Sequence, residues 1–247
     1  MHALEEFGRD LASLLAPEAC VACRTPVGDI GPSDWRRVLC ASCRAKLELL
    51  EEACRRCGSA RGPYLGDEGP CRACAGSARG RVRTTTALFR YRGVGRGVLM
   101  ALKYRRRDRL GVALGRALGR RWRAREPDAA ASPTLWVVPV PLHPFRRWRR
   151  GYNQAEEIAV GVAESLGRPW VDALRRRRST PPLFALEREA RERTMAGAFA
   201  PRGGRSLVGR TVALVDDIRT SGATLREAAA ALHAAGAARV HALVVAR

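Results

Sequence analysis

The segment VALVDDIRTSGATLREAAAAL, residues 212–232, decides the fold of this chain. Its first four residues form a short apolar run, as expected of a buried strand. Its last part carries apolar side chains at i, i+3, i+4 and i+7, the spacing of a helix: Leu225, Ala228, Ala229 and Leu232. The polar segment between them is therefore predicted to be a loop that joins strand to helix. In open α/β sheets such loops lie at the carboxyl ends of strands, where ligands bind.

The second part of the chain repeats this alternation of strand and helix. Three more β-rich runs are strand candidates, namely TTALFRYRG (85–93), TLWVVPVP (134–141) and VHALVVAR (240–247). Helical patterns lie over residues 98–122 and 153–167, and Asn153 is predicted to cap the second of these helices. Residues 123–133 are predicted to form a surface loop or hinge. This order of elements predicts a mainly parallel sheet with helices on its faces.

The chain is strongly basic. Its 247 residues include 45 Lys and Arg against 24 Asp and Glu, which gives a formal net charge of +21, and nearly all of the basic residues are arginine. Such a charge favours polyanionic partners, namely nucleic acid, anionic lipid or phosphorylated small molecules. A GC-rich genome would produce the same composition without selection for a partner, so both explanations stay open.

No segment predicts export or membrane insertion. The first residues, MHALEEFGRDLASLLAPEAC, interrupt their leucines with Glu5, Glu6 and Asp10, which predicts an amphipathic helix rather than a signal peptide. No later stretch contains the ~18 apolar residues of a membrane span. We therefore expect a cytoplasmic protein, and in that reducing compartment clustered cysteines bind metal more often than they form disulfides.

All eight cysteines lie near the N-terminus and form four CxxC pairs. The pairs are Cys20 with Cys23, Cys40 with Cys43, Cys54 with Cys57, and Cys71 with Cys74. Two such pairs turn four thiolates toward one point and complete a tetrahedral zinc site with no open position, so the sites are predicted to be structural. The sequence leaves open whether consecutive pairs share a zinc ion or the two sites interleave. Disulfides or loose thiols are the alternative.

The composition changes after the cysteines, and this change predicts two domains. Residues 1–80 are predicted to hold the N-terminal helix and a double zinc-ribbon module, and residues 81–247 the α/β domain. The small and charged stretch AGSARGRVR, residues 75–83, is typical of a linker. Because the first part has few large apolar residues, we expect zinc to supply much of its folding free energy.

The loop of the opening segment offers two kinds of binding group. Asp216 and Asp217 can accept hydrogen bonds from the vicinal hydroxyls of a ribose. The residues that offer hydroxyls, backbone N–H groups and a helix N-terminus to a 5′-phosphate are Thr220, Ser221, Gly222, Ala223 and Thr224. One loop can thus hold a sugar phosphate at both ends. An acidic helix cap on an unrelated α/β protein is the alternative.

The stretch LVDDIRTSGATL resembles the phosphoribosyl-pyrophosphate loop of type I phosphoribosyltransferases. The match is nearly unbroken and sits between a predicted strand and a predicted helix, so it is more specific than a lone glycine motif. The resemblance implies that Asp216 and Asp217 contact the ribose hydroxyls and that residues 220–224 contact the 5′-phosphate.

A second stretch, VVPVPLHPFRRWRRGYNQAEEIA (137–159), looks like a signature of the ComF family of competence-associated proteins. The segments ALKYRRRD and GAFAPRGGRSLVGRTVALVDD fit as well, so the resemblance covers essentially the whole chain. Members join an N-terminal zinc module to a phosphoribosyltransferase domain, the order predicted here. The resemblance implies a type I phosphoribosyltransferase-like parallel sheet with flanking helices, preceded by a cysteine-rich zinc-ribbon module.

The same resemblance extends the candidate site to other segments. In such folds the loop after the second core strand meets pyrophosphate, which implies a role for two sets of residues. The first set is Pro139, Val140 and Pro141, and the second is Arg150, Gly151, Tyr152 and Asn153. Lys103 occupies the family's LK position, and we expect it to contact phosphate. The neighbouring Arg146, Arg147 and Arg149 are expected to form a solvated basic turn.

Two positions depart from the family pattern. Relatives commonly carry glutamine three residues after a threonine, and asparagine two residues after an arginine. In this chain, Leu183 occupies the glutamine position after Thr180, and Arg193 occupies the asparagine position after Arg191. Both changes remove side-chain amide groups that would form hydrogen bonds with a substrate, so the sequence does not identify the acceptor.

The resemblance implies two alternative functions. As an enzyme, the protein would bind phosphoribosyl pyrophosphate with Mg²⁺ and transfer the pentosyl group in DNA uptake or nucleotide metabolism, with Asp216, Asp217 and Lys103 as catalytic residues. As a non-catalytic accessory, it would bind single-stranded DNA or the DNA-uptake machinery and use the sugar-phosphate pocket as a sensor. The basic runs 105–107, 146–150 and 175–178 favour the accessory, with Trp148 and Tyr152 placed to stack on bases.

Overall fold

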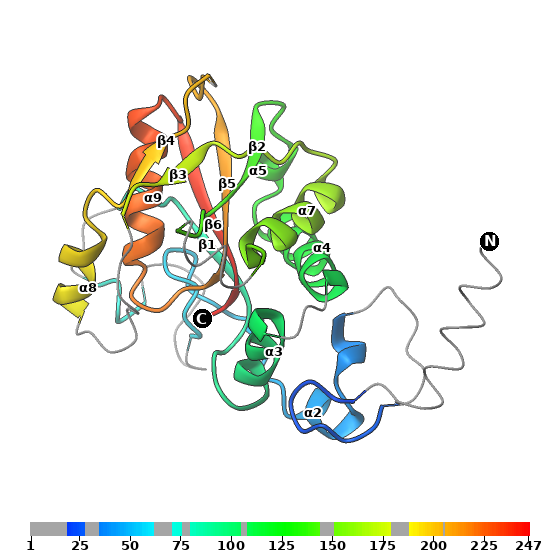
Figure 1. Cartoon of the computed structure of the whole chain (residues 1–247). Helices are drawn as coiled ribbons and strands as arrows, with labels where there is room; N and C mark the ends of the chain where they lie inside the picture. Colours follow the sequence, from blue (N-terminus) through cyan, green and yellow to red (C-terminus); the bar gives the residue numbers. More distant parts are fainter. Residues whose placement is uncertain are drawn as a thin grey trace.

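The computed structural model describes residues 19–27, 35–61, 71–75, 80–104, 108–143, 151–178, 188–204 and 206–247. The predicted N-terminal helix and the basic runs 105–107 and 146–150 lie outside the described residues. The larger part of the molecule is a sheet between two layers of helices, and the first cysteine-rich segment lies at one end of it, beside α3 (Figure 1). Within the described residues, no helix is both long and apolar enough to cross a membrane.

Four parallel strands form the central sheet, in the order β1–β6–β5–β2. They are β1 (Thr85–Phe89), β2 (Leu135–Pro139), β5 (Thr211–Ile218) and β6 (Arg239–Ala246). Their nearly continuous apolar sequences fit strands that are buried on both faces. The predicted parallel sheet is confirmed.

Helices cover both faces of this sheet (Figure 1). The alternation along β5 separates the layers, because Ala213 and Val215 pack in the cluster that contains the helices α4 (Asp108–Arg125) and α7 (Gln154–Leu166). Val212 and Leu214 pack instead with α9 (Ala223–Ala234). The helix α3 (Gly93–Tyr104) follows β1 and precedes α4.

The prediction of a loop over residues 123–133 is wrong. The helix α4 continues to Arg125, and α5 (Pro127–Ala131) follows directly. Proline is compatible with the first turn of a helix, because the N–H that it lacks has no partner there. Pro127 therefore begins a helix at a position where the sequence analysis expected a break.

A second, two-stranded sheet lies outside the central one. It pairs β3 (Leu174–Arg176) with β4 (Phe199–Pro201) in antiparallel register, and α8 (Arg188–Met195) lies between them in the chain. Each strand has only three residues, too few for an alternating pattern to be recognised. This sheet was not predicted.

The cysteine-rich part contains two knuckles with the same backbone pattern. Cys20 N–H donates to Thr25 O and Cys54 N–H donates to Ser59 O, both at 2.8 Å. The fourth residue after each first cysteine has positive φ, 66° at Arg24 and 71° at Gly58. Between the knuckles lie the 3-10 helix η1 (Trp35–Val38) and α2 (Ala41–Ala45).

Candidate functional site

The two acids of the opening segment stand at the carboxyl end of β5. The strand continues to Ile218, so Asp216 and Asp217 belong to its last residues rather than to the loop after it. Asp217 N–H donates to Asp216 Oδ1 at 2.9 Å. Lys103 reaches this point from the last turn of α3, and its Nζ lies 2.7 Å from Asp217 Oδ2. The structure thus brings Lys103 and both acids together.

Asp216 lies in an environment that disfavours its charge. Burial and the neighbouring Asp217 carboxylate raise the pKa of Asp216 to about 8, while the Asp217 N–H and Lys103 oppose the shift. Asp216 is therefore largely protonated near neutral pH in the protein without ligand. A bound cation or a hydroxyl donor at this point would favour the ionised form.

The loop from Arg219 to Gly222 leads from these acids to the N-terminus of α9. Gly222 has φ 81°, a left-handed conformation that side chains other than glycine rarely adopt. Ser221 Oγ accepts a hydrogen bond from Ala223 N–H at 3.4 Å, and Arg226 Nη1 donates to Ser221 O at 3.0 Å. The first N–H groups of α9 therefore lie directly after the two carboxylates, at the same edge of the sheet.

The segment after β2 lies beside the end of β5. Val140 N–H donates to Val215 O at 2.8 Å, which places Pro139 and Val140 next to the acids. Asn153 joins this segment to α7, since its Oδ1 accepts from Ala155 N–H and its Nδ2 donates to Val140 O, both at 3.2 Å. The predicted cap of α7 is confirmed.

Other predicted residues around this segment have different outcomes. Gly151 is exposed with φ 82°. Tyr152 is half-buried and its hydroxyl donates to Leu102 O, which ties the ring to α3. Arg150 and Trp148 lie outside the described residues, as do Thr180 and Leu183.

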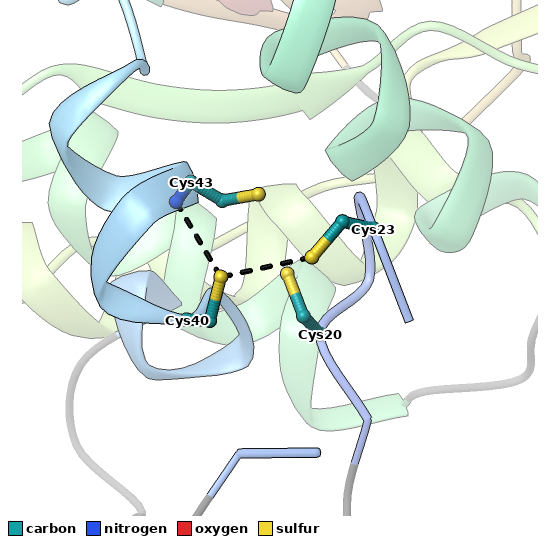
Figure 2. A group of neighbouring side chains, drawn as sticks. All are labelled: Cys20, Cys23, Cys40 and Cys43. Atoms are coloured by element: carbon teal, nitrogen blue, oxygen red, sulfur yellow. Dashed lines mark hydrogen bonds between the residues drawn. The ribbon is translucent and has the colours of Figure 1, made fainter. Parts of the chain in front are cut away.

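The eight cysteines form two separate tetrads, each built from consecutive CxxC pairs. One comprises Cys20, Cys23, Cys40 and Cys43, and the other Cys54, Cys57, Cys71 and Cys74. In each tetrad the four Sγ atoms lie within 4.8 Å of one another, and Figure 2 shows the first tetrad gathered in one place. All eight are free thiols. The pairing that the sequence left open is thus the consecutive one.

The sulfur positions fit zinc. Cys23 and Cys40 place their Sγ atoms 3.6 Å apart, and Cys57 and Cys71 place theirs 3.5 Å apart. Zn–S bonds of about 2.3 Å in a tetrahedron put sulfur atoms about 3.8 Å apart. Four thiolates leave no coordination position open, which is the chemistry of a structural site.

One thiol of the second tetrad is poised to ionise without metal. Burial acts to raise the pKa of Cys57, but hydrogen bonds with Ser59 and the neighbouring cysteines together lower it to about 6. Burial raises the pKa of Cys74 to about 12. The buried tetrad therefore cannot hold four thiolates by itself, and a divalent cation would supply the charge that allows it.

Sequence reasoning missed the role of Arg219. It lies inside the predicted binding loop, yet its side chain leaves the acids and reaches the second cysteine tetrad, where Nη1 donates to Arg56 O at 3.3 Å. The sequence feature that points to it is a long, positively charged side chain directly before the small residues of the loop.

Comparisons with known proteins agree with this architecture. A double zinc ribbon domain matches residues 11–75, and a phosphoribosyl transferase domain matches residues 149–247. The DNA utilization protein YhgH of Escherichia coli K12 is 30% identical over 229 residues, which are 92% of this chain and 96% of that protein.

Two competence proteins are similar as well. Competence protein F of Haemophilus influenzae is 34% identical over 113 residues, 45% of this chain and 49% of that protein. Competence protein ComFC of Bacillus subtilis is 28% identical over 207 residues, 78% of this chain and 77% of that protein. A zinc ribbon followed by a phosphoribosyltransferase-like α/β domain, together with a relative matched over nearly its whole length, shows that this chain belongs to the ComF family.

Proposed function

We propose that this protein binds phosphoribosyl pyrophosphate at the carboxyl edge of its sheet. The observation that carries the proposal is the convergence of Asp216 with the ion pair of Lys103 and Asp217, shortly before the left-handed Gly222 and the N-terminus of α9. A diol needs carboxylate acceptors, and a phosphate needs backbone donors and positive charge. Both sets stand a few residues apart on one strand-loop-helix unit.

Each part of the site has a distinct role in this proposal. Asp216 and Asp217 accept the ribose hydroxyls, and residues 220–224 bind the 5′-phosphate. Pro139, Val140 and Gly151 lie on the side that meets the pyrophosphate, and Arg150, which lies outside the described residues, contributes a cation to the same ligand group. Lys103 leaves Asp217 when the ligand enters and contacts a phosphate oxygen, because its ammonium group lies within 2.7 Å of the carboxylate that the ribose would engage.

Mg²⁺ fits the oxygen donors of this site. It binds through one or two carboxylates together with substrate phosphates, and Asp216 and Asp217 are adjacent carboxylates at the ligand position. When bound, the ion would neutralise charge on the pyrophosphate. The protein's own residues would hold the ribose, orient C1′ toward an acceptor and stabilise the departing pyrophosphate with cationic groups. The reaction proposed is pentosyl transfer, with displacement of pyrophosphate at C1′.

Isothermal titration with phosphoribosyl pyrophosphate and Mg²⁺ tests the binding. We expect saturable binding in the wild type and a loss of at least about 100-fold in affinity in the double variant Asp216→Asn, Asp217→Asn, because both carboxyl groups that would engage the ribose hydroxyls and Mg²⁺ are removed. Asp172→Asn is a matched control, since this half-exposed carboxylate pairs with Arg202 beside β3 and β4. Absence of binding in the wild type would overturn the proposal.

Catalysis needs a separate measurement. Pyrophosphate release would be followed with a panel of bases and amines as acceptors. Release with one acceptor, abolished in the double variant, would establish a phosphoribosyltransferase. Binding of phosphoribosyl pyrophosphate without pyrophosphate release with any acceptor would establish a ligand-binding role.

Binding of single-stranded DNA is the second candidate function, favoured by the relatives' names and by the exposed arginines of the β3 segment. Arg175, Arg177 and Arg178 are exposed there, in the run that the sequence analysis singled out. Arginine contacts to phosphates release counterions, so affinity should fall steeply with salt. Salt-dependent binding of a single-stranded oligonucleotide that weakens in Arg175→Ala, Arg177→Ala but survives the Asp216, Asp217 double variant would establish this function. If the arginine double variant binds the oligonucleotide as tightly as the Asp216, Asp217 double variant, the β3 arginines do not contribute to DNA binding.

A further inference from the structure

The second cysteine tetrad is packed directly against the strand-loop unit of the candidate site. The segment that leads into its first knuckle runs along the outer edge of β1, where Leu50 N–H donates to Leu88 O at 2.9 Å and Thr85 N–H donates to Arg55 O at 2.6 Å. Thr85 Oγ1 also donates to Arg56 O at 3.0 Å. Gly58 completes the fit, because a Cβ at this position would lie 3.1 Å from Thr85 Cγ2. The backbone between Cys54 and Cys57 is therefore held by β1.

Arg219 fills the space between this knuckle and the sugar-phosphate loop. Its Nη1 donates to Arg56 O and to Thr85 Oγ1. On its other side the guanidinium lies beneath Gly222, since a Cβ on Gly222 would stand 2.9 Å from Arg219 Nε. The Nε atom is buried and has no acceptor among the described residues. The loop thus rests on a guanidinium whose other end is fixed to the knuckle.

Arg247 makes a parallel connection at the end of β6. Its Nε donates to Cys57 O at 3.0 Å, and its Nη1 donates to Arg219 O at 3.5 Å. Arg219 N–H in turn donates to Ala246 O at 3.0 Å. The C-terminus and the second cysteine segment accordingly lie close together (Figure 1). Both arginines bond carbonyls of the Arg56–Cys57 peptide turn, so the loop and the knuckle share one hydrogen-bond network.

Charge reinforces the connection. Burial lowers the pKa of Arg219, and the charges of Arg247 and Arg226 lower it further, whereas those of Cys57 and Cys74 act in the opposite direction. Zinc with four thiolates carries a net charge of about −2, which would compensate a buried guanidinium in a low-dielectric setting.

We propose that zinc at the second tetrad and ligand at the sugar-phosphate loop are thermodynamically coupled, with Arg219 as the positioning residue that connects them. Zinc fixes the Arg56–Cys57 turn, the turn fixes Arg219, and Arg219 supports Gly222 in the shape that receives a phosphate. Coupling is reciprocal, so ligand binding must strengthen zinc binding by the same factor. This inference rests on the proposed function.

Zinc release measures the coupling from the metal side. Transfer of zinc from the intact protein to the chromogenic chelator 4-(2-pyridylazo)resorcinol would be followed with and without phosphoribosyl pyrophosphate and Mg²⁺. We expect the ligand to slow release of one of two zinc ions by a factor of about five or more, the range of typical couplings. The Asp216→Asn, Asp217→Asn variant controls for chelation of zinc by the ligand itself and should show no slowing.

The variant Arg219→Met measures the coupling from the loop side, because it keeps the length of the side chain and removes its donors. We expect faster release of one zinc ion and weaker binding of phosphoribosyl pyrophosphate, each by a factor of about five or more. Arg239→Met is the matched control, an exposed arginine at the opposite end of β6, and should change neither. Gly58→Ala perturbs the same contact from the knuckle and should act in the same direction as Arg219→Met.

The outcomes separate this inference from the proposed function. A wild-type protein that does not bind the ligand overturns both. Ligand binding with no effect on zinc release overturns the coupling alone and leaves the proposed function standing. If the Arg219→Met variant binds ligand and zinc like the wild type, Arg219 is not the residue that connects the two sites. If that variant does not fold, the wild-type release experiment still decides the coupling.

Discussion

At the scale of single residues, the two neighbouring acids of β5 have different surroundings. Asp217 is ion-paired with Lys103, whereas burial and the charge of Asp217 raise the pKa of Asp216 to about 8. Adjacent carboxylates in a partly closed site cannot both ionise without compensation. A site that is incompletely charged without ligand is suited to a partner that brings its own cation, as a magnesium pyrophosphate does.

The pH dependence of stability tests the state of Asp216. Because its folded pKa lies above the unfolded value of 3.8, its protonated form stabilises the fold. That contribution is complete below about pH 4 and is lost as the pH rises toward about 8. We expect Asp216→Asn to remove a decline of at most about 1.4 kcal/mol per pH unit in the free energy of unfolding. Urea denaturation of both proteins across this range is the measurement; parallel pH profiles would contradict the assignment.

At the scale of elements, the helices α4 and α7 approach closely because glycines line their contact. A Cβ at Gly115 would overlap the carbonyl oxygen of Ile158, and a Cβ at Gly161 would overlap that of Val112. The close crossing places the N-terminus of α7 beside β2, where Asn153 meets Val140. Packing far from the acids therefore helps to set the geometry of the candidate site.

Gly115→Ala should destabilise the protein, although alanine has the higher helix propensity. Propensity favours alanine by about 1 kcal/mol, but overlap with a backbone carbonyl forces the helices apart at a cost of about 1–3 kcal/mol or more. Thermal unfolding would show the lowered midpoint. Gly203→Ala is the control, because nothing lies within 4 Å of a Cβ there, and its midpoint should stay near that of the wild type.

The cap of α7 offers a pair of variants that separate stability from ligand geometry. Asn153→Ala removes both the cap and the bond to Val140 O, and should cost about 1–3 kcal/mol. Asn153→Asp keeps an acceptor for Ala155 N–H but removes the donor to Val140. We expect Asp to recover part of the stability while leaving binding of phosphoribosyl pyrophosphate impaired. Denaturation and calorimetry on both variants decide this, and full recovery of binding by Asp would contradict the role of the Val140 contact.

At the scale of the whole molecule, the cysteine-rich part is joined to the α/β domain by side chains from both. Arg55 Nη2 lies 2.7 Å from Glu126 Oε1, and Arg125 Nη2 donates to Ala53 O at 2.7 Å. Solvent partly screens this pair, because the Arg55 side chain is largely exposed although that of Glu126 is not. The backbone hydrogen bonds along β1 are the stronger connection. The boundary predicted near residue 80 stays a prediction.

Metal analysis should find two zinc ions per chain, one for each tetrad, because the tetrads share no ligand. Removal of zinc by a chelator should abolish the structure of the cysteine-rich part, whose apolar content is too small to fold it alone. Cys54→Ser should lower the zinc content by one, as should Cys20→Ser. A content of one zinc in the wild type would contradict this prediction, because one of the two tetrads would then bind no zinc. Amide hydrogen exchange would report which segments lose protection.

The sequence by itself determined the strands of the central sheet and the chemistry carried by local motifs, but not α5 or the short strands β3 and β4. Periodic apolar residues predicted β5 and α9, and CxxC spacing predicted tetrahedral metal sites, because both depend on residues close together in the chain. The loop motif named Asp216 and Asp217 for the same reason. The change in composition after the cysteines predicted the order of domains, and the family resemblance agreed with it.

Only the tertiary structure decided which distant groups meet. The pairing of the tetrads, the ion pair of Lys103 with Asp217, and the path of Arg219 to the knuckle all join residues from 17 to 163 positions apart. A local pattern contains no information about such contacts, since the packing of the sheet edge and helices fixes them. The conformation of the loop from Arg219 to Gly222 is therefore a property of the folded molecule, although its residues could be read from the sequence.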